Sequence, residues 1–86
     1  MKVQIPSPLY SYTDGRRDVE AGGRTLRELL ADLDARYPGM RFRIEDEQGA
    51  IRPHMRFFVN RELVRSLDFE LRADDEILLV AALSGG

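Results

Sequence analysis

The feature that most constrains the fold is a continuous apolar run, Ile77 to Leu83, near the end of the 86-residue sequence. Its length is typical of one strand, and apolar side chains at every position, rather than at alternate positions, indicate a strand buried on both faces. Such a strand lies in the centre of a sheet. The rest of the sequence must therefore supply neighbouring strands and a layer to cover them.

One helix is available as that layer. Thr25 and Glu28 form the pattern of a capping box, in which each side chain satisfies a free backbone N–H at the start of a helix. Apolar residues then repeat at steps of three and four, which places them on one stripe: Leu26, Leu29, Leu30, Leu33 and Tyr37. Pro38-Gly39 ends the predicted helix.

The first strands precede this helix. Val3-Gln4-Ile5 alternates as a strand does, and Pro6 and Pro8 place the following chain at a sheet edge or bulge. We expect extended chain again over residues 9–12. Asp14-Gly15 favours a type I′ turn, and residues 18–21 alternate polar with apolar side chains. The sequence thus predicts a β-hairpin before the helix.

The second half predicts another hairpin. Residues 40–53 mix apolar residues with an acidic stretch and are expected to be a loop with short extended pieces. Arg56 to Val59 is rich in β-forming residues, Asn60 favours a turn, and Leu63-Val64 can pair back. In a regular strand Phe57 and Phe58 point to opposite faces, so one is expected in the core and the other is a candidate for a contact surface.

The resulting order is strand, strand, helix, strand, short strand, strand. It allows the first and last strands to lie side by side in parallel, with the helix as a right-handed crossover. This is the β-grasp arrangement, an α+β fold with a mixed sheet packed on one main helix. We expect one domain over residues 1–83 and a flexible tail over residues 84–86.

Composition excludes several classes of function. The sequence has no cysteine and one histidine, His54, so thiolate and histidine-based metal sites and side-chain thiol catalysis are excluded. A net charge of −2 lacks the basic excess that nucleic acids require. No apolar run approaches the roughly 18 residues of a membrane span, and the first residues lack a signal-peptide core. The expected location is the cytoplasm.

The final residues, Ser84-Gly85-Gly86, carry little side chain, and two glycines can pass through a channel too narrow for a β-carbon. With the β-grasp order, they give the sequence its resemblance to the MoaD/ThiS family of ubiquitin-like sulfur carriers. Residues 75–86 resemble the closing block of that family, Val59-Asn60-Arg61 its Val-Asn-Gly hairpin, and residues 25–33 its first helix. The long front and residues 52–60 resemble the CysO-like subgroup more than the short thiamin-pathway members.

The sequence also departs from the family. Arg61 stands where the family usually has glycine, Asp74 stands where Asp-Gly is usual, and Ala81-Ala82 where prolines are common. These departures bear on the choice of partner and leave the terminal chemistry untouched.

The resemblance implies a carrier and not an enzyme. A ubiquitin-activating-type partner would adenylate the Gly86 carboxylate with ATP and magnesium, and a persulfide sulfur would convert it to a thiocarboxylate for a sulfur-accepting synthase. Ser84 and Gly85 would thread the tail into the partner. The chain would bind no cofactor permanently and would be a monomer.

The resemblance also implies docking through Val80 and Leu63. The alternative is that both are ordinary core residues. Three further candidates have plainer interpretations. His54 is expected to be exposed and inert, the Asp75-Glu76 pair a solvated turn rather than a metal site, and Arg56 a surface arginine rather than part of a contact with an acidic partner.

Three alternatives to a free carrier stay open. The chain could be the small subunit of a molybdopterin synthase, with its tail in a larger catalytic subunit. It could be a ubiquitin-like modifier joined to lysines, or a β-grasp binding module without terminal chemistry.

Overall fold

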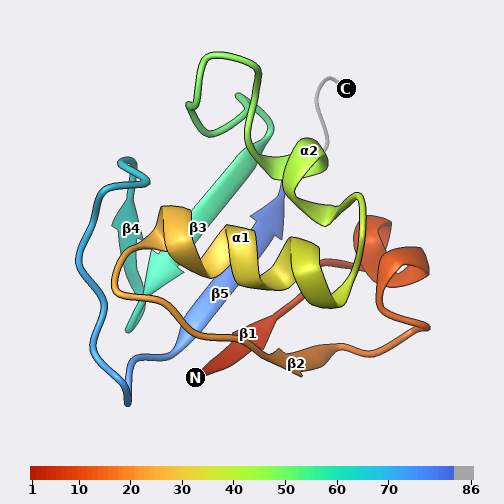
Figure 1. Cartoon of the computed structure of the whole chain (residues 1–86), viewed down its shortest axis with the longest axis horizontal. Coiled ribbons are helices and arrows are strands. Elements are labelled where there is room, and N and C mark those ends of the chain that lie inside the picture. Colours follow the sequence, from red (N-terminus) through yellow and green to blue (C-terminus); the bar gives the residue numbers. More distant parts are fainter. Residues whose placement is uncertain (83–86) are drawn as a thin grey trace.

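The computed structural model describes residues 1–82, and these form a five-stranded mixed sheet with its main helix packed across one face (Figure 1). The strands follow the order β2-β1-β5-β3-β4 across the sheet. The elements are, in chain order, β1 (Lys2–Gln4), the 3-10 helix η1 (Ser7–Tyr12), β2 (Asp18–Glu20), α1 (Leu26–Arg36), α2 (Met40–Ile44), β3 (Met55–Val59), β4 (Glu62–Val64) and β5 (Ile77–Ala81).

The first and last strands pair in parallel, as the β-grasp arrangement requires. Val3 is opposite Ile77 and Gln4 is opposite Leu78, whereas β1 with β2, β3 with β4 and β3 with β5 are antiparallel. The predicted α+β class and strand order are confirmed.

The α1 helix covers this sheet with the predicted leucine stripe. Leu26, Leu29, Leu30 and Leu33 are fully buried, and Tyr37 is half-buried at the helix end. Thr25 Oγ1 accepts a hydrogen bond from the Glu28 N–H at 3.2 Å, which confirms half of the capping box. The Glu28 carboxylate differs from expectation, because it accepts from the Arg24 N–H at 2.9 Å rather than from the N–H of Thr25.

Two segments expected to be extended or irregular are helical. Residues 9–12 belong to η1, where Pro8 supplies a backbone angle suited to the first helical turn and Leu9 is buried in the core. As a result β2 pairs with β1 and not with residues 9–12, although Asp14 and Gly15 do take the positive φ angles of the predicted turn.

The second helical segment is α2, within the predicted loop. Gly39 precedes it with a φ of 96°, in the left-handed region that glycine favours, and Asp34 Oδ1 accepts hydrogen bonds from the N–H groups of Gly39 and Arg41. Met40 and Ile44, four residues apart, are both fully buried. A five-residue helix has too few repeats to be recognised from periodicity.

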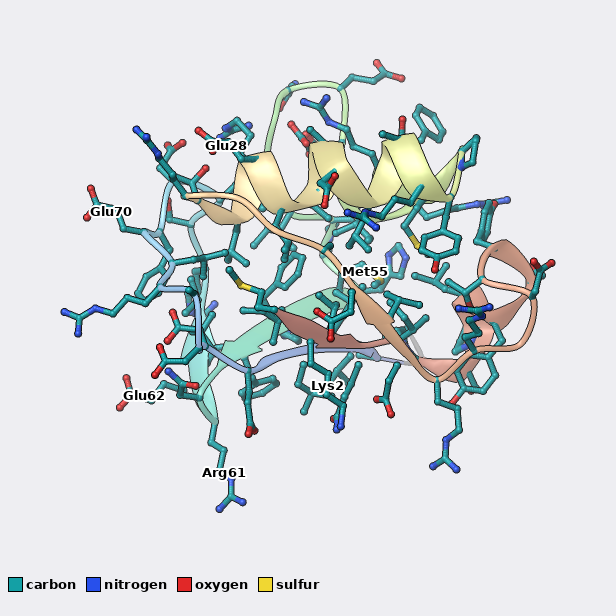
Figure 2. The ribbon with its side chains drawn as sticks, turned by 60° about the horizontal axis from the view of Figure 1, so that its bottom comes forward. Lys2, Glu28, Met55, Arg61, Glu62 and Glu70 are labelled. Atoms are coloured by element: carbon teal, nitrogen blue, oxygen red, sulfur yellow. The ribbon has the colours of Figure 1, made fainter. Side chains whose placement is uncertain are left out.

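The prediction that the last strand is buried on both faces is wrong. β5 is central, between β1 and β3, but Ile77 and Leu79 are buried against α1 while Leu78 remains 38% exposed. Figure 2 shows the one-sided arrangement: Met55 lies between the sheet and α1, whereas Lys2 and Arg61 point away from the helix. No helix among residues 1–82 is long and apolar enough to span a membrane.

The geometry of the β3–β4 turn shows why glycine is usual at the position of Arg61. Asn60 and Arg61 both have positive φ, 50° and 72°, as the two central residues of a type I′ turn require. Glycine adopts this conformation freely, and a residue with a β-carbon does so at a cost of about 1–2 kcal/mol.

We predict that Arg61→Gly raises the free energy of unfolding by about 1 kcal/mol, because relief of the strain exceeds the added freedom of the unfolded chain. Urea unfolding followed by circular dichroism measures the change. Arg61→Ala is the matched control, since it removes the side chain and retains the β-carbon. An equal gain in both variants would show that strain at this φ is not the cause.

Candidate functional site

The face of the sheet turned away from α1 carries an apolar row. Phe58 of β3 is paired with Leu63 of β4 on one side and with Leu78 of β5 on the other, so the three side chains line up across three strands. Leu63 is 41% exposed and Leu78 is 38% exposed, and Phe58 is half-buried. Exposed apolar side chains gathered on one face are typical of a protein contact surface.

Val80 extends this row toward the end of β5. It lies two residues after Leu78, so its side chain shares the same face, and it is half-buried. The four residues Phe58, Leu63, Leu78 and Val80 are called the open face below. The structure thus places Leu63 and Val80, the two residues expected to dock, on the same face of the sheet, with β3 between them.

The sequence could not identify the other two members of the open face. Phe57 is fully buried and Phe58 is not, which resolves the pair whose orientation the sequence left undecided. Leu78 was missed because every residue from Ile77 to Leu83 is apolar, so the run carries no alternation from which the faces could be assigned.

A groove of about 460 Å³ borders the open face. It lies between η1 and β5, and Pro6, Tyr10, Leu78 and Val80 are among its lining residues. The groove exists because residues 7–12 form η1 instead of continuing β1. The same helix therefore supplies Leu9 to the core and one wall to the open face.

A hydrogen-bonded cluster fixes the start of β5. Asp75 accepts from the Asn60 side-chain amide at 2.8 Å and from the Arg72 N–H at 2.8 Å, and Asn60 Oδ1 accepts from the Glu76 N–H at 3.0 Å. The hydrogen bond from Arg72, followed by that from Asn60, holds the pKa of the Asp75 carboxyl below its ordinary value of 3.8. Asp75 stays ionised at neutral pH and ties the β3–β4 turn to β5.

Two other carboxyl groups are held ionised in the same way. The Gly22 N–H donates a hydrogen bond to Asp32 Oδ2 at 2.9 Å, and this bond is the main cause that lowers the pKa of Asp32. The hydrogen bond from the Ala50 N–H to Asp46 Oδ1 is the main cause that lowers the pKa of Asp46. Both carboxylates are occupied with backbone donors. They therefore stabilise the loops around them and are not free to act as acids or bases.

The other end of β5 is fixed to the chain before β3. The Ala82 N–H donates to the His54 carbonyl oxygen at 2.7 Å, which continues the β3–β5 ladder by one residue. Ala82 is the last residue that the structure describes. The predicted carrier and threading residues, Ser84, Gly85 and Gly86, lie outside the described residues, as does Leu83.

The remaining sequence candidates are placed as follows. His54 is exposed, and Asp75 and Glu76 belong to the turn that leads into β5. Among residues 1–82, no group of three or more histidine, aspartate or glutamate side chains is arranged to hold a metal ion. Arg56 is exposed and lies beside Val80 in the paired strands.

Comparison with known proteins identifies the family. Residues 3–86 match the model of the ThiS family. This chain belongs to the ThiS family. Sulfur carrier protein CysO from Mycobacterium tuberculosis is 33% identical to it over 89 aligned residues, which cover 98% of this chain and 96% of the relative.

Solved structures agree with that assignment. A chain in the crystal structure of the Amycolatopsis orientalis BexX/CysO complex matches with a TM-score of 0.91 and 32% identity, over 99% of this ThiS-family chain and 98% of the other. SAMP1 from Haloferax volcanii matches with a TM-score of 0.78 and 26% identity, over 100% and 98% of the two chains. The family, its CysO-like branch and the sulfur carrier function expected from the sequence are confirmed.

Proposed function

We propose that this ThiS-family sulfur carrier holds its sulfur as a thiocarboxylate on Gly86, formed after a separate enzyme adenylates the Gly86 carboxylate. The observation that supports the proposal most is the family match, which extends through residue 86 and so includes both terminal glycines. A carboxylate is a poor electrophile. Attack by its oxygen on the α-phosphorus of magnesium-bound ATP expels pyrophosphate and gives a mixed anhydride, from which sulfide can displace AMP.

The part of this chain in that reaction is presentation. The acidic groups that hold low pKa values accept hydrogen bonds from backbone N–H groups, and His54 is exposed and forms no ion pair among residues 1–82. General acid–base catalysis needs a proton-transfer group within reach of the reacting atoms. The adenylating enzyme is proposed to supply that group together with the ATP and magnesium site.

Docking on the enzyme is proposed to use the open face. One face of the sheet is covered by α1, and the opposite face carries the exposed Leu63 and the half-buried Val80. Val80 belongs to β5, the strand that leads to the C-terminal segment. A partner seated there is aligned with the direction of β5. Ser84 and Gly85 are proposed to thread the tail into the active site because they place little or no side chain in its path.

The acceptor is proposed to be a synthase of amino-acid biosynthesis. The 33% identity with CysO over nearly the whole chain favours this branch over the small subunit of a molybdopterin synthase. Stable co-purification with a large molybdopterin-synthase subunit would favour the alternative, and ladders of lysine conjugates would favour a modifier.

The terminal chemistry predicts a defined mass change. Incubation with ATP, magnesium, sulfide and the adenylating enzyme of the same organism is expected to raise the intact mass by the difference between one sulfur and one oxygen atom. Deletion of Gly86 is expected to abolish the gain, because the carboxylate is then displaced by one residue. Intact-protein mass spectrometry measures both results. An unchanged wild-type mass, with an enzyme shown to be active on ATP, would contradict the thiocarboxylate proposal.

The docking face predicts a second result. Leu63→Ser is expected to raise the KM for the carrier about tenfold, because it removes an exposed apolar side chain of the open face and its contact with the enzyme. Phe69→Ser is the matched control: Phe69 is equally exposed, at 41%, but belongs to the segment that packs against the start of α1. Steady-state adenylation at varied carrier concentration measures KM. Equal effects of the two substitutions would contradict docking through the open face.

A further inference from the structure

Three arginines gather at one end of the open face. Arg52, Arg56 and Arg65 line a hollow of about 230 Å³, together with apolar residues that include Pro53 and Leu63, and no acidic residue lines it. The strand register explains the gathering, because Arg56 and Arg65 flank the paired residues Phe57 and Val64. The hollow is called the arginine hollow below.

Two of these arginines are held by the backbone. Arg52 Nε donates to the Phe42 carbonyl oxygen at 2.8 Å, and its guanidinium lies over the Phe42 ring, 4.8 Å from the centroid. Arg56 Nη1 donates to the carbonyl oxygens of Pro53 and Met55. Carbonyl groups orient a guanidinium without neutralising it, and its remaining N–H groups stay available for a carboxylate.

The arginines of the hollow also form no ion pair among residues 1–82. Within the same residues, the arginines that do so are Arg27, Arg36 and Arg41. Asp46 is close enough to Arg52 for the arginine to help lower its pKa, so Asp46 partly offsets the charge of Arg52 and leaves Arg56 and Arg65 as the free positive charges of the hollow among the described residues. A chain of net charge −2 therefore carries a local positive surface.

The arginine hollow lies next to both the open face and the end of β5, which leads to the C-terminal segment. Leu63 belongs both to the open face and to the lining of the hollow, and Arg56 is paired with Val80 across β3 and β5. Arg52 and Arg56 are each two residues from His54, whose carbonyl oxygen binds the Ala82 N–H. Figure 1 shows the start of β3 beside the end of β5, where this contact lies.

We propose that the arginine hollow receives carboxylate side chains from an acidic surface segment of the adenylating enzyme, next to the entrance that takes the C-terminal segment. This inference rests on the proposed function. Guanidinium groups pair with carboxylates through two parallel hydrogen bonds, which gives the contact a direction as well as attraction. Apolar contact at the open face and charge contact at the hollow would then set the carrier at a fixed angle to the entrance.

The test is a double charge reversal, Arg56→Glu with Arg65→Glu. The dissociation constant between this variant and the adenylating enzyme is expected to rise about tenfold or more at low salt, because both arginine–carboxylate attractions become repulsions. Added salt is expected to weaken binding of the wild type and to strengthen that of the variant, since screening reduces both interactions. Isothermal titration calorimetry at two salt concentrations measures these constants, with circular dichroism to verify folding.

Matched variants distinguish a local charge contact at the hollow from a general effect of net charge. Arg16→Glu with Arg24→Glu makes the same change in net charge at two exposed arginines outside the hollow and is expected to leave binding within about twofold of wild type. Arg56→Lys with Arg65→Lys keeps the charge but cannot form the two parallel hydrogen bonds, and is expected to bind with an affinity between those of the wild type and the reversed variant.

The outcomes also distinguish this inference from the proposed function. Equal binding by the wild type and the hollow-reversed variant, or equal loss in both reversed pairs, overturns the arginine hollow as a docking site even if thiocarboxylate forms. A wild type that binds without gaining sulfur contradicts the proposed function, and the reversal still decides the role of the hollow. A wild type that does not bind the enzyme overturns both.

Discussion

Parallel pairing of β1 with β5 is the constraint on which the rest of the structure depends. It places the last strand in the centre of the sheet and forces the chain to cross over one face, where α1 supplies four fully buried leucines. Because α1 covers only that face and η1 only borders the opposite one, the opposite face has no covering layer (Figure 2). The apolar residues of β3, β4 and β5 that face outward are exposed because of this one-sided arrangement, and they are the surface proposed to meet a partner.

The elements that the sequence predicted correctly carry local signals. The N-terminal cap at Thr25, the leucine stripe and the Asn60 turn each specify a structure within a few residues. Residues 7–12 and 40–44 lacked such signals. The 3-10 helix that contains Pro8 and the five-residue helix after Gly39 depend on the burial of Leu9, Met40 and Ile44 in a core assembled from distant segments. Tertiary packing decided their conformation.

The candidate site was predictable in its chemistry and only partly in its geometry. The glycines at 85 and 86 and the closing block indicated a sulfur carrier, and Leu63 and Val80 do share the open face. The apolar run from Ile77 could not reveal which side chains face outward, since it lacks alternation, and strand register resolved this by pairing Phe58 with Leu78. The arginine hollow was equally hidden, because its members are separated in sequence and meet only through the register of β3 and β4.

The uncovered face of the sheet is the surface proposed to meet the partner. Amide chemical-shift mapping of the isotope-labelled carrier, titrated with the adenylating enzyme, tests this proposal directly. The structure predicts that the largest changes lie at Phe58, Leu63, Leu78 and Val80, with smaller changes on the exposed side of α1. Changes concentrated on α1 and α2, with the open face unaffected, would contradict the claim.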